Sequence, residues 1–335
     1  MLANVDLKPY NTMGVSSVAD FFTTVHDLDE LKKALAFAKE KGLRPFVLGG
    51  GSNLLLVSER LSRVVMHMAI EGFEKVGESS EAIFIKVGAG ESWHGTVQRT
   101  LKLGLPGLEN LALIPGSVGA AVVQNIGAYG SEVAQFVKEV EVYDPASGER
   151  RTVKHAECDF RYRHSLFKTP KAADWVVLSV TLALPKRWEP NLSYKDLQQA
   201  FSEGGLSTAV GIFDAVVALR QKKLPDPREI GSAGSFFKNP IVTREAFQAL
   251  LEQFPSIVHY RLAGGLEKLA AGWMIDYAGL KGFREGDAGV YDKQALVLVN
   301  YGYATGSELW QLAQDVRAKV KAVFGIELEP EPVIL

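Results

Sequence analysis

Three consecutive glycines between two short apolar runs restrict what the first part of the chain can form. The run Gly49-Gly50-Gly51-Ser52-Asn53 follows Pro45-Phe46-Val47-Leu48 and continues into Leu54-Leu55-Leu56-Val57. Glycines let backbone amides approach a phosphate closely. A Rossmann loop needs Gly-x-Gly-x-x-Gly at the start of a helix, but here the third spaced glycine is absent and a strand-like run follows. The loop therefore favours either a phosphate site of another kind or a tight turn between two strands.

A second segment, residues 104–130, is crowded with Gly, Pro and Asn. A long irregular segment in a compact domain is usually functional or disordered, and its apolar content makes disorder the weaker interpretation. Two separated loops of small residues suit a cofactor that extends between them, with Gln124, Asn125 and Tyr129 as polar edges for a ring system. Because no Gly-Lys-Ser/Thr motif follows a glycine loop, a flavin fits better than a nucleoside triphosphate.

Hydrophobic periodicity and turn residues predict an alternation of strands and helices, which indicates an α/β first half. The stretch from Pro185 to Pro190 is interpreted as a domain boundary. The predicted helices cover residues 27–41, 92–103, 213–222, 244–254, 268–277 and 307–324, and the predicted strands cover 45–48, 54–57, 83–87, 137–143, 175–184 and 295–300.

Length and composition narrow the class of protein. With 335 residues the chain is long enough for two or three domains. The formal net charge is −2 and no basic stripe is visible, which argues against nucleic acid as a partner. The longest apolar stretch is too short to span a membrane, and the start lacks a secretory signal. The single cysteine, Cys158, cannot form an internal disulfide, so we expect a cytoplasmic protein.

Four further segments are too specific to be turn chemistry. They are Phe160-Arg161-Tyr162-Arg163-His164-Ser165, Lys223-Leu224-Pro225-Asp226-Pro227, Gly231-Ser232-Ala233-Gly234-Ser235-Phe236-Phe237-Lys238-Asn239-Pro240 and Leu328-Glu329-Pro330-Glu331-Pro332. Together with the two glycine-rich segments, they closely resemble the UDP-N-acetylenolpyruvoylglucosamine reductase family. The resemblance runs from about Leu7 to Pro332, and the motifs follow the family's order.

The resemblance implies an α+β fold. An FAD-binding region of two subdomains, of the vanillyl-alcohol-oxidase-like (PCMH-type) kind, is expected over residues 1–66 and 67–187. A separate α+β substrate-binding domain is expected over residues 188–324, with the tail 325–335 packing back near the site. The segment Asn191-Leu192-Ser193-Tyr194-Lys195-Asp196-Leu197 resembles the tyrosine loop of the family's first type.

The resemblance also implies the reaction. A monomer would hold FAD without a covalent bond, take electrons from NADPH, and reduce UDP-N-acetylglucosamine enolpyruvate to UDP-N-acetylmuramate. That reaction belongs to peptidoglycan synthesis, and so to cell shape and cell division. No metal is expected. NADPH and the substrate are expected to use one pocket in turn, which gives ping-pong kinetics.

The family pattern places the catalytic roles on Arg163, Ser235 and Glu331. Hydride addition to the enolpyruvyl group leaves negative charge beside its carboxylate, and the guanidinium of Arg163 supplies a fixed bidentate cation for it. Ser235 then protonates the carbanion, and Glu331 completes the site as an acid or a hydrogen-bond partner. Taken singly, each of the three also has an ordinary interpretation, as a surface charge, a loop serine and a solvated tail residue.

The remaining site residues come from the same resemblance. FAD is expected to contact Gly49, Gly50, Gly51, Ser52, Asn53, Pro115, Gly116, Ser117, Gly119, Asn125, Gly127, Ala128 and Tyr129. The diphosphate and sugar of the substrate are expected to contact Tyr194, Arg220, Lys223, Asn239 and Gln294.

Three positions depart from the family pattern, and two other functions stay open. His164 stands where Asp is expected, Val122-Val123 replaces a stretch in which Pro is common, and Pro332 stiffens the tail. One alternative is an FAD oxidase on the same fold. It is disfavoured because the glycine loop holds no His that could tether the flavin. The other is a binding module without turnover, which has no use for a proton donor such as Ser235.

Overall fold

The computed structural model describes residues 1–202 and 208–335. The chain divides into two compact units. The N-terminal unit contains Met1–Val5, Ala19–Gly50 and Ser62–Lys222, and the C-terminal unit contains Asp6–Val18, Gly51–Leu61 and Lys223–Leu335. The chain passes from the first unit to the second between Gly50 and Gly51, inside the glycine run.

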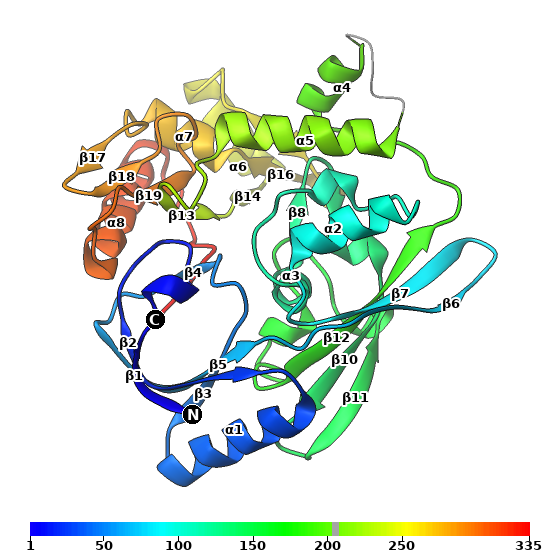
Figure 1. The fold of residues 1–335 in the computed structure, drawn as a ribbon. Helices are drawn as coiled ribbons and strands as arrows, with labels where there is room; N and C mark the ends of the chain where they lie inside the picture. The colour runs from blue at the N-terminus through cyan, green and yellow to red at the C-terminus, as the bar shows by residue number, and fades with distance from the viewer. Residues whose placement is uncertain (203–207) are drawn as a thin grey trace. The chain divides into compact units, whose positions relative to one another are not determined.

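A four-stranded sheet begins the N-terminal unit, in the order β1 (Leu2–Asp6), β2 (Val18–Val25), β5 (Arg60–Met68) and β3 (Arg44–Leu48). Helix α1 (Leu28–Lys41) packs on it through Leu31, Ala34 and Ala38 (Figure 1). The side chain of Asp27 accepts the N–H of Glu30 at 2.8 Å and caps this helix. Gly42 ends it in the left-handed conformation.

A five-stranded sheet forms the centre of the N-terminal unit. Its order is β11 (Glu149–Lys154), β10 (Val137–Asp144), β12 (Val176–Pro185), β7 (Ala82–Gly88) and β6 (Phe73–Glu78). Every neighbouring pair in it is antiparallel. The α/β character inferred from the alternation of elements is therefore wrong for this sheet, because hairpins rather than helical crossovers join β6 to β7 and β10 to β11. The α+β class is confirmed.

Four further helices of the N-terminal unit share a hydrophobic core with this sheet. They are α2 (Trp93–Lys102), α3 (Val118–Gln124), α4 (Lys195–Ser202) and α5 (Ala209–Lys223). Strand β12 contributes Val177, Val180 and Leu182 to this core, and Val176 and Leu178 to the core beneath α1. Burial on both faces explains its continuous apolar sequence. Cys158 lies in the same core, where burial raises the pKa of its thiol to about 12.

The C-terminal unit contains two antiparallel sheets and three helices. The first sheet has the order β13 (Gly231–Ser235), β19 (Val297–Asn300), β18 (Ala288–Val290) and β17 (Arg284–Glu285). The second has the order β14 (Ile241–Thr243), β16 (Leu266–Leu269) and β15 (His259–Arg261). The helices are α6 (Arg244–Gln253), α7 (Ala271–Tyr277) and α8 (Gly306–Phe324). Near the C-terminus, β20 (Val333–Ile334) pairs in parallel with β4 (Leu54–Leu55).

None of the described helices is long and apolar enough to cross a membrane. Several short elements complete the fold. The hairpin β8 (Gly127–Ala128) with β9 (Ser131–Glu132) follows α3. The 3-10 turns are η1 (Lys8–Tyr10), η2 (Glu109–Leu111), η3 (Val133–Phe136), η4 (His155–Glu157), η5 (Leu166–Lys168) and η6 (Ala263–Gly265).

The helix predicted over residues 213–222 is longer in the structure, where it spans Ala209–Lys223. Two other predicted elements differ because of strand pairing. The helix predicted over residues 268–277 begins only at Ala271, because Lys268 and Leu269 belong to β16, where Lys268 pairs with Ile241 and Tyr260. The strand predicted over residues 54–57 is limited to Leu54–Leu55, whose partner is a strand at the far end of the chain. In both cases pairing between distant residues overrides the local pattern.

The start of α8 leads to a stability prediction. A Cβ atom on Gly306 would lie 1.6 Å from the carbonyl oxygen of Leu56 and 2.9 Å from Val57 Cα, so backbone would have to move. We expect Gly306→Ala to lower the free energy of unfolding by about 1–3 kcal/mol, measured by chemical denaturation. Gly77→Ala is the matched control, since its nearest neighbour is Phe84 Cδ2 at an ordinary 3.6 Å. Equal stabilities of the two variants would contradict the packing argument.

Candidate active site

The two glycine-rich loops meet in backbone contact within the N-terminal unit. A Cβ atom on Gly50 would lie 2.8 Å from Gly116 Cα, and one on Gly49 would lie 2.6 Å from Ser117 Oγ. Gly116 itself has a φ of +115°, which other residues rarely adopt. Glycine is therefore required at these positions, because a side chain would keep the two loops apart. Where the loops meet, the surface consists mainly of backbone atoms.

The second loop is also fixed to the segment before α2 and to the first residue of that helix. Trp93 N–H donates to Gly116 O at 3.0 Å, Val118 N–H donates to Glu91 O at 2.9 Å, and Gly119 N–H donates to Ala89 O at 3.0 Å. The amides at the start of α3 are thus engaged within the protein. Phosphate contacts in this region have to come from other groups of the two loops.

The hairpin after α3 is held by Asn125. This residue has a φ of 44° and is fully buried. Its Nδ2 donates to Glu132 Oε2 at 3.0 Å and to Arg161 O at 2.8 Å, and its Oδ1 accepts the N–H of Ala134 at 3.2 Å. Asn125 thereby joins Gly127, Ala128 and Tyr129 on the hairpin to the segment that carries Arg163.

The rest of the first loop lies in the C-terminal unit. Gly51 has a φ of +59°, and its carbonyl accepts the N–H of Thr12 at 3.1 Å. Asn53 Nδ2 donates to the carbonyl of Glu331 at 3.3 Å, and Asn53 O accepts the N–H of Val333 at 3.0 Å. The residues that follow Ser52 are thus tied to the C-terminal tail.

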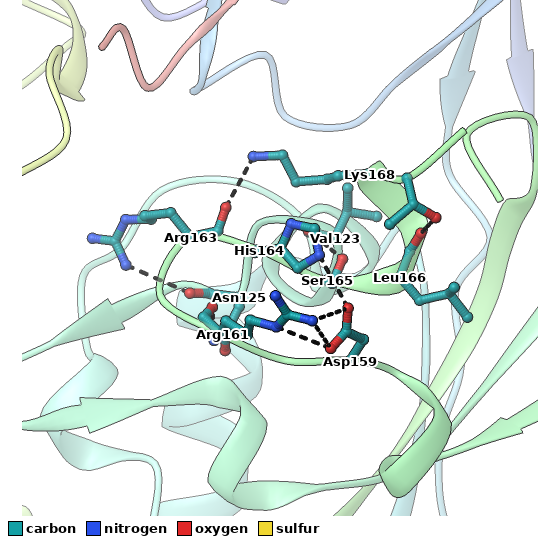
Figure 2. Close-up of polar contacts among 10 residues, drawn as sticks. Val123, Asn125, Asp159, Arg161, Arg163, His164, Ser165, Leu166 and Lys168 are labelled. Carbon is teal, nitrogen blue, oxygen red and sulfur yellow. Dashed lines mark hydrogen bonds and ion pairs between the residues drawn. The ribbon is translucent and has the colours of Figure 1, made fainter. Parts of the chain in front are cut away.

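Arg163 is a central residue of a tight turn (Figure 2). Arg161 and His164 exchange backbone hydrogen bonds of 3.1 and 2.9 Å across it. Arg163 has a φ of 53°, where a turn ordinarily places Gly or Asn. Its guanidinium makes long hydrogen bonds to Asn125 O (3.5 Å) and Gly127 O (3.3 Å). This two-pronged group, called the fork below, therefore lies along the backbone of the second loop.

His164 faces a carboxylate on the other side of this turn. Its Nε2 lies 3.3 Å from Asp159 Oδ2, and the guanidinium of Arg161 binds the same carboxylate at 2.9–3.1 Å. The hydrogen bonds from Arg161 lower the pKa of Asp159. The histidine that replaces the expected Asp is therefore held by Asp159.

Ser235 and Glu331 lie on neighbouring segments of the C-terminal unit. Ser235 ends β13, after a register shift against β19 at which Gly234 has a φ of +70°. Such bulges turn the following side chain away from the regular alternation. Glu331 N–H donates to Phe236 O at 2.8 Å, and Lys238 N–H donates to Glu329 O at 2.9 Å.

Two buried aromatic rings hold this arrangement. Phe236 and Phe237 are 0% and 1% exposed, and their rings contact each other edge to face, with centroids 5.2 Å apart. Phe237 bridges to Pro330 on the tail, and an ion pair joins Lys238 to Glu329. The segment with Ser235 and the segment with Glu331 are therefore placed by the same core.

Tyr194 contacts the hairpin after α3. Its ring meets the ring of Tyr129 edge to face, with centroids 5.0 Å apart. Asn191 Nδ2 donates to Gly130 O at 3.0 Å, and Asn110 Nδ2 donates to both Tyr129 O and Asn191 O at 2.9 Å. The two asparagines join the tyrosine loop to the glycine-rich segment.

Arg220, on α5, has a buried Nε that finds no hydrogen-bond partner within residues 1–202 and 208–335. Burial lowers the pKa of its guanidinium, while Tyr129 acts in the opposite direction. Burial and the charge of Arg220 lower the pKa of nearby His94. His94 Nδ1 accepts the N–H of Leu113 at 2.9 Å, and its ring stacks on Phe213 at 5.6 Å. A partly buried guanidinium whose Nε has no hydrogen-bond partner among the described residues suits an anionic ligand.

The other expected substrate residues lie in the C-terminal unit. Asn239 Oδ1 accepts the N–H of Ala271 at 3.0 Å, and a Cβ atom on Gly272 would lie 2.9 Å from Gln294 Oε1. Asn239 and Gln294 thus each lie beside the first residues of α7. Lys223 ends α5 and precedes the turn at Asp226, whose pKa is lowered to about 2 by hydrogen bonds from Arg228.

Sequence analysis did not single out the residues that support this site. They are Asn110, Asn191, His94 and Lys168. The first three bond main-chain atoms at least 19 residues away, and Lys168 bonds the carbonyl of Arg163 and the distant side chain of Gln124. No periodicity marks them, because their partners are backbone atoms. The sequence signal that could have pointed to Asn110 is its position as a polar residue within a glycine-rich segment.

The residues of the two loops fit FAD. The missing Cβ atoms of Gly49 and Gly50 allow a close approach of two backbones, and Ser117 adds a polar side chain beside Gly49. Such a backbone-lined site without a basic cluster suits a diphosphate joined to aromatic rings.

Comparison with known proteins agrees with this assignment. Residues 19–154 match the FAD binding domain, and residues 226–335 match the C-terminal domain of UDP-N-acetylenolpyruvoylglucosamine reductase. The reductase of Pseudomonas putida is 47% identical over 98% of this chain and 97% of its own length. That of Chromobacterium violaceum is 48% identical over 99% of this chain and 98% of its own length.

A solved structure supports the same conclusion. The UDP-N-acetylenolpyruvylglucosamine reductase of Thermus caldophilus superposes with a TM-score of 0.70 at 28% identity, and the match covers 98% of this chain and 97% of that one. The resemblance read from the motifs is thereby confirmed. The chain belongs to the UDP-N-acetylenolpyruvoylglucosamine reductase family of FAD-dependent oxidoreductases.

Proposed function

We propose that this protein reduces UDP-N-acetylglucosamine enolpyruvate to UDP-N-acetylmuramate for peptidoglycan synthesis, with NADPH as reductant, and that Ser235 supplies the proton that completes the product. The observation that carries the proposal is the bond from Glu331 N–H to Phe236 O, which fixes a carboxylic acid residue beside the strand end that bears Ser235. A hydroxyl and a carboxyl group on adjacent segments suit proton delivery.

Arg163 binds the carboxylate of the enolpyruvyl group in this proposal. Bound FAD supplies the hydride that adds to the terminal carbon. Negative charge then develops on the neighbouring carbon and spreads into the carboxylate, where a guanidinium fork can meet both oxygens. The turn around Arg163 holds the fork in place before the substrate arrives, so little reorganisation is needed.

Ser235 transfers its hydroxyl proton to the carbon that carries this charge. A serine hydroxyl is a weak acid, so the transfer requires that its oxygen be stabilised as the proton leaves. Glu331 is the neighbouring group on the tail, where it acts as an acid or a hydrogen-bond partner. Solvent returns a proton to the serine after turnover.

The substrate's diphosphate and sugar bind Tyr194, Arg220, Lys223, Asn239 and Gln294 in this proposal. Support comes from the buried Nε of Arg220, which has no hydrogen-bond partner in the described chain. A diphosphate would compensate that charge. We further propose that the protein is a cytoplasmic monomer with subdomains at residues 1–66 and 67–187 and a substrate domain at 188–324.

Anaerobic spectroscopy tests the reaction and the role of Ser235 together. We expect NADPH to bleach the bound flavin and the enolpyruvyl substrate to restore its colour. Ser235→Ala should bleach normally but regain colour about 10²–10⁴ times more slowly, because the proton donor is lost. Ser232→Ala, in the same strand, is the control and should behave as wild type. Colour restored by oxygen alone would indicate an oxidase, and a colourless protein would indicate a binding module.

Replacing Arg220 tests the anion site by stability and affinity at once. We expect Arg220→Met to raise the thermal midpoint of the ligand-free protein, since a partly buried guanidinium with an unbonded Nε is removed. The KM for the enolpyruvyl substrate should rise at least about tenfold, because a charge-assisted bond to phosphate is lost. Lys222→Met, at an exposed position two residues on, is the control. An unchanged KM in Arg220→Met would exclude Arg220 from substrate binding.

A further inference from the structure

The backbone of Arg163 is strained, and something must hold it. A φ of 53° is unfavourable for a residue with a side chain, and such residues persist only where their surroundings impose the conformation. Glycine at this position would relieve the strain but would remove the guanidinium. The surroundings of the turn are therefore part of the catalytic arrangement.

Three side chains tie the turn to the C-terminal end of α3. Asn125 Nδ2 donates to Arg161 O at 2.8 Å, and Ser165 Oγ donates to Val123 O at 2.7 Å. These two bonds fix the residues on either side of Arg163. The third comes from Lys168, whose Nζ donates to the carbonyl of Arg163 itself at 3.1 Å.

Lys168 is anchored at a second point. Its Nζ also donates to Gln124 Oε1 at 2.9 Å, on the last residue of α3. A cation near a helix C-terminus is electrostatically favoured. Figure 2 shows the ammonium reaching the carbonyl of Arg163 while the guanidinium of Arg163 points the other way, toward Asn125. Lys168 therefore holds the peptide group that follows Arg163 without occupying the space around the fork.

We propose that Lys168 is a positioning residue for the reduction, which fixes the main chain of Arg163 so that its guanidinium meets the substrate carboxylate in one orientation. This inference rests on the proposed role of Arg163. An ammonium bound to a carbonyl is a charge-assisted hydrogen bond, stronger than the neutral bonds made by Asn125 and Ser165. Its loss would let the turn relax from the left-handed conformation and displace the fork.

The test separates the two halves of the reaction by stopped flow. We expect Lys168→Met to slow recolouring of the reduced flavin by the enolpyruvyl substrate about 10–100-fold, because small displacements of a positioned group have effects of this size. Bleaching by NADPH and the thermal midpoint should stay close to wild type. Lys168→Arg, which keeps a cationic donor, should recover most of the rate. Lys171→Met, at an exposed position nearby, should match wild type.

Arg163→Met distinguishes failure of this inference from failure of the proposed function. If Arg163→Met recolours slowly but Lys168→Met matches wild type, Lys168 does not position Arg163. The inference is also overturned if Lys168→Arg is as slow as Lys168→Met while both bind FAD normally. If Arg163→Met itself recolours at the wild-type rate, the proposed role of Arg163 is wrong and Lys168 has nothing to position.

Discussion

The left-handed backbone of Arg163 is the constraint on which the proposed chemistry depends. A turn with Gly at this position would form more easily, yet only an arginine presents a bidentate cation. The protein maintains the unfavourable conformation through hydrogen bonds between this turn and the C-terminal end of α3. These bonds are made by the side chains of Asn125, Ser165 and Lys168. Because α3 is in turn fixed by the bonds of Gly116, Val118 and Gly119 to the segment before α2, the second glycine-rich loop and Arg163 belong to one rigid arrangement within the N-terminal unit. The loop assigned to FAD and the residue assigned to the substrate carboxylate therefore share their support.

The C-terminal unit also holds two site residues in fixed positions, but it does so with backbone hydrogen bonds and buried aromatic rings. There the strand end with Ser235 and the tail with Glu331 are held by backbone bonds and by the buried rings of Phe236 and Phe237. The tail also pairs with the residues that follow the first glycine loop, through Asn53 and through β4 with β20. Segments nearly 280 residues apart in sequence, Asn53 and Glu331, thus become neighbours. In both units a side chain to which we assign a catalytic role lies on an irregular backbone position, a left-handed turn residue or a bulge, whose geometry is imposed by the surrounding core.

The sequence predicts correctly those helices that are marked by residues close together in the chain. Helices α1 and α8 were predicted within a residue or two, since a capping residue and an apolar stripe mark each. The α/β interpretation and the helix start at residue 268 failed, because strand pairing over long distances decides both. The motif segments identified the family, and the resemblance to that family is what assigns roles to Arg163, Ser235 and Glu331. The supporting residues could not be found this way: Lys168 and Gln124 are 44 positions apart and meet only in the folded chain.

The claim most in need of a direct test is that Arg163 recognises the substrate carboxylate. The measurement is calorimetric binding of the enolpyruvyl substrate and of its vinyl ether analogue, which lacks the carboxylate, to oxidised wild-type protein and to Arg163→Met. The account predicts that wild type prefers the carboxylate-bearing ligand by at least about tenfold, as expected for a charge-assisted pair, and that Arg163→Met loses this preference while it binds the analogue as well as wild type does. An equal preference in both proteins would contradict the account.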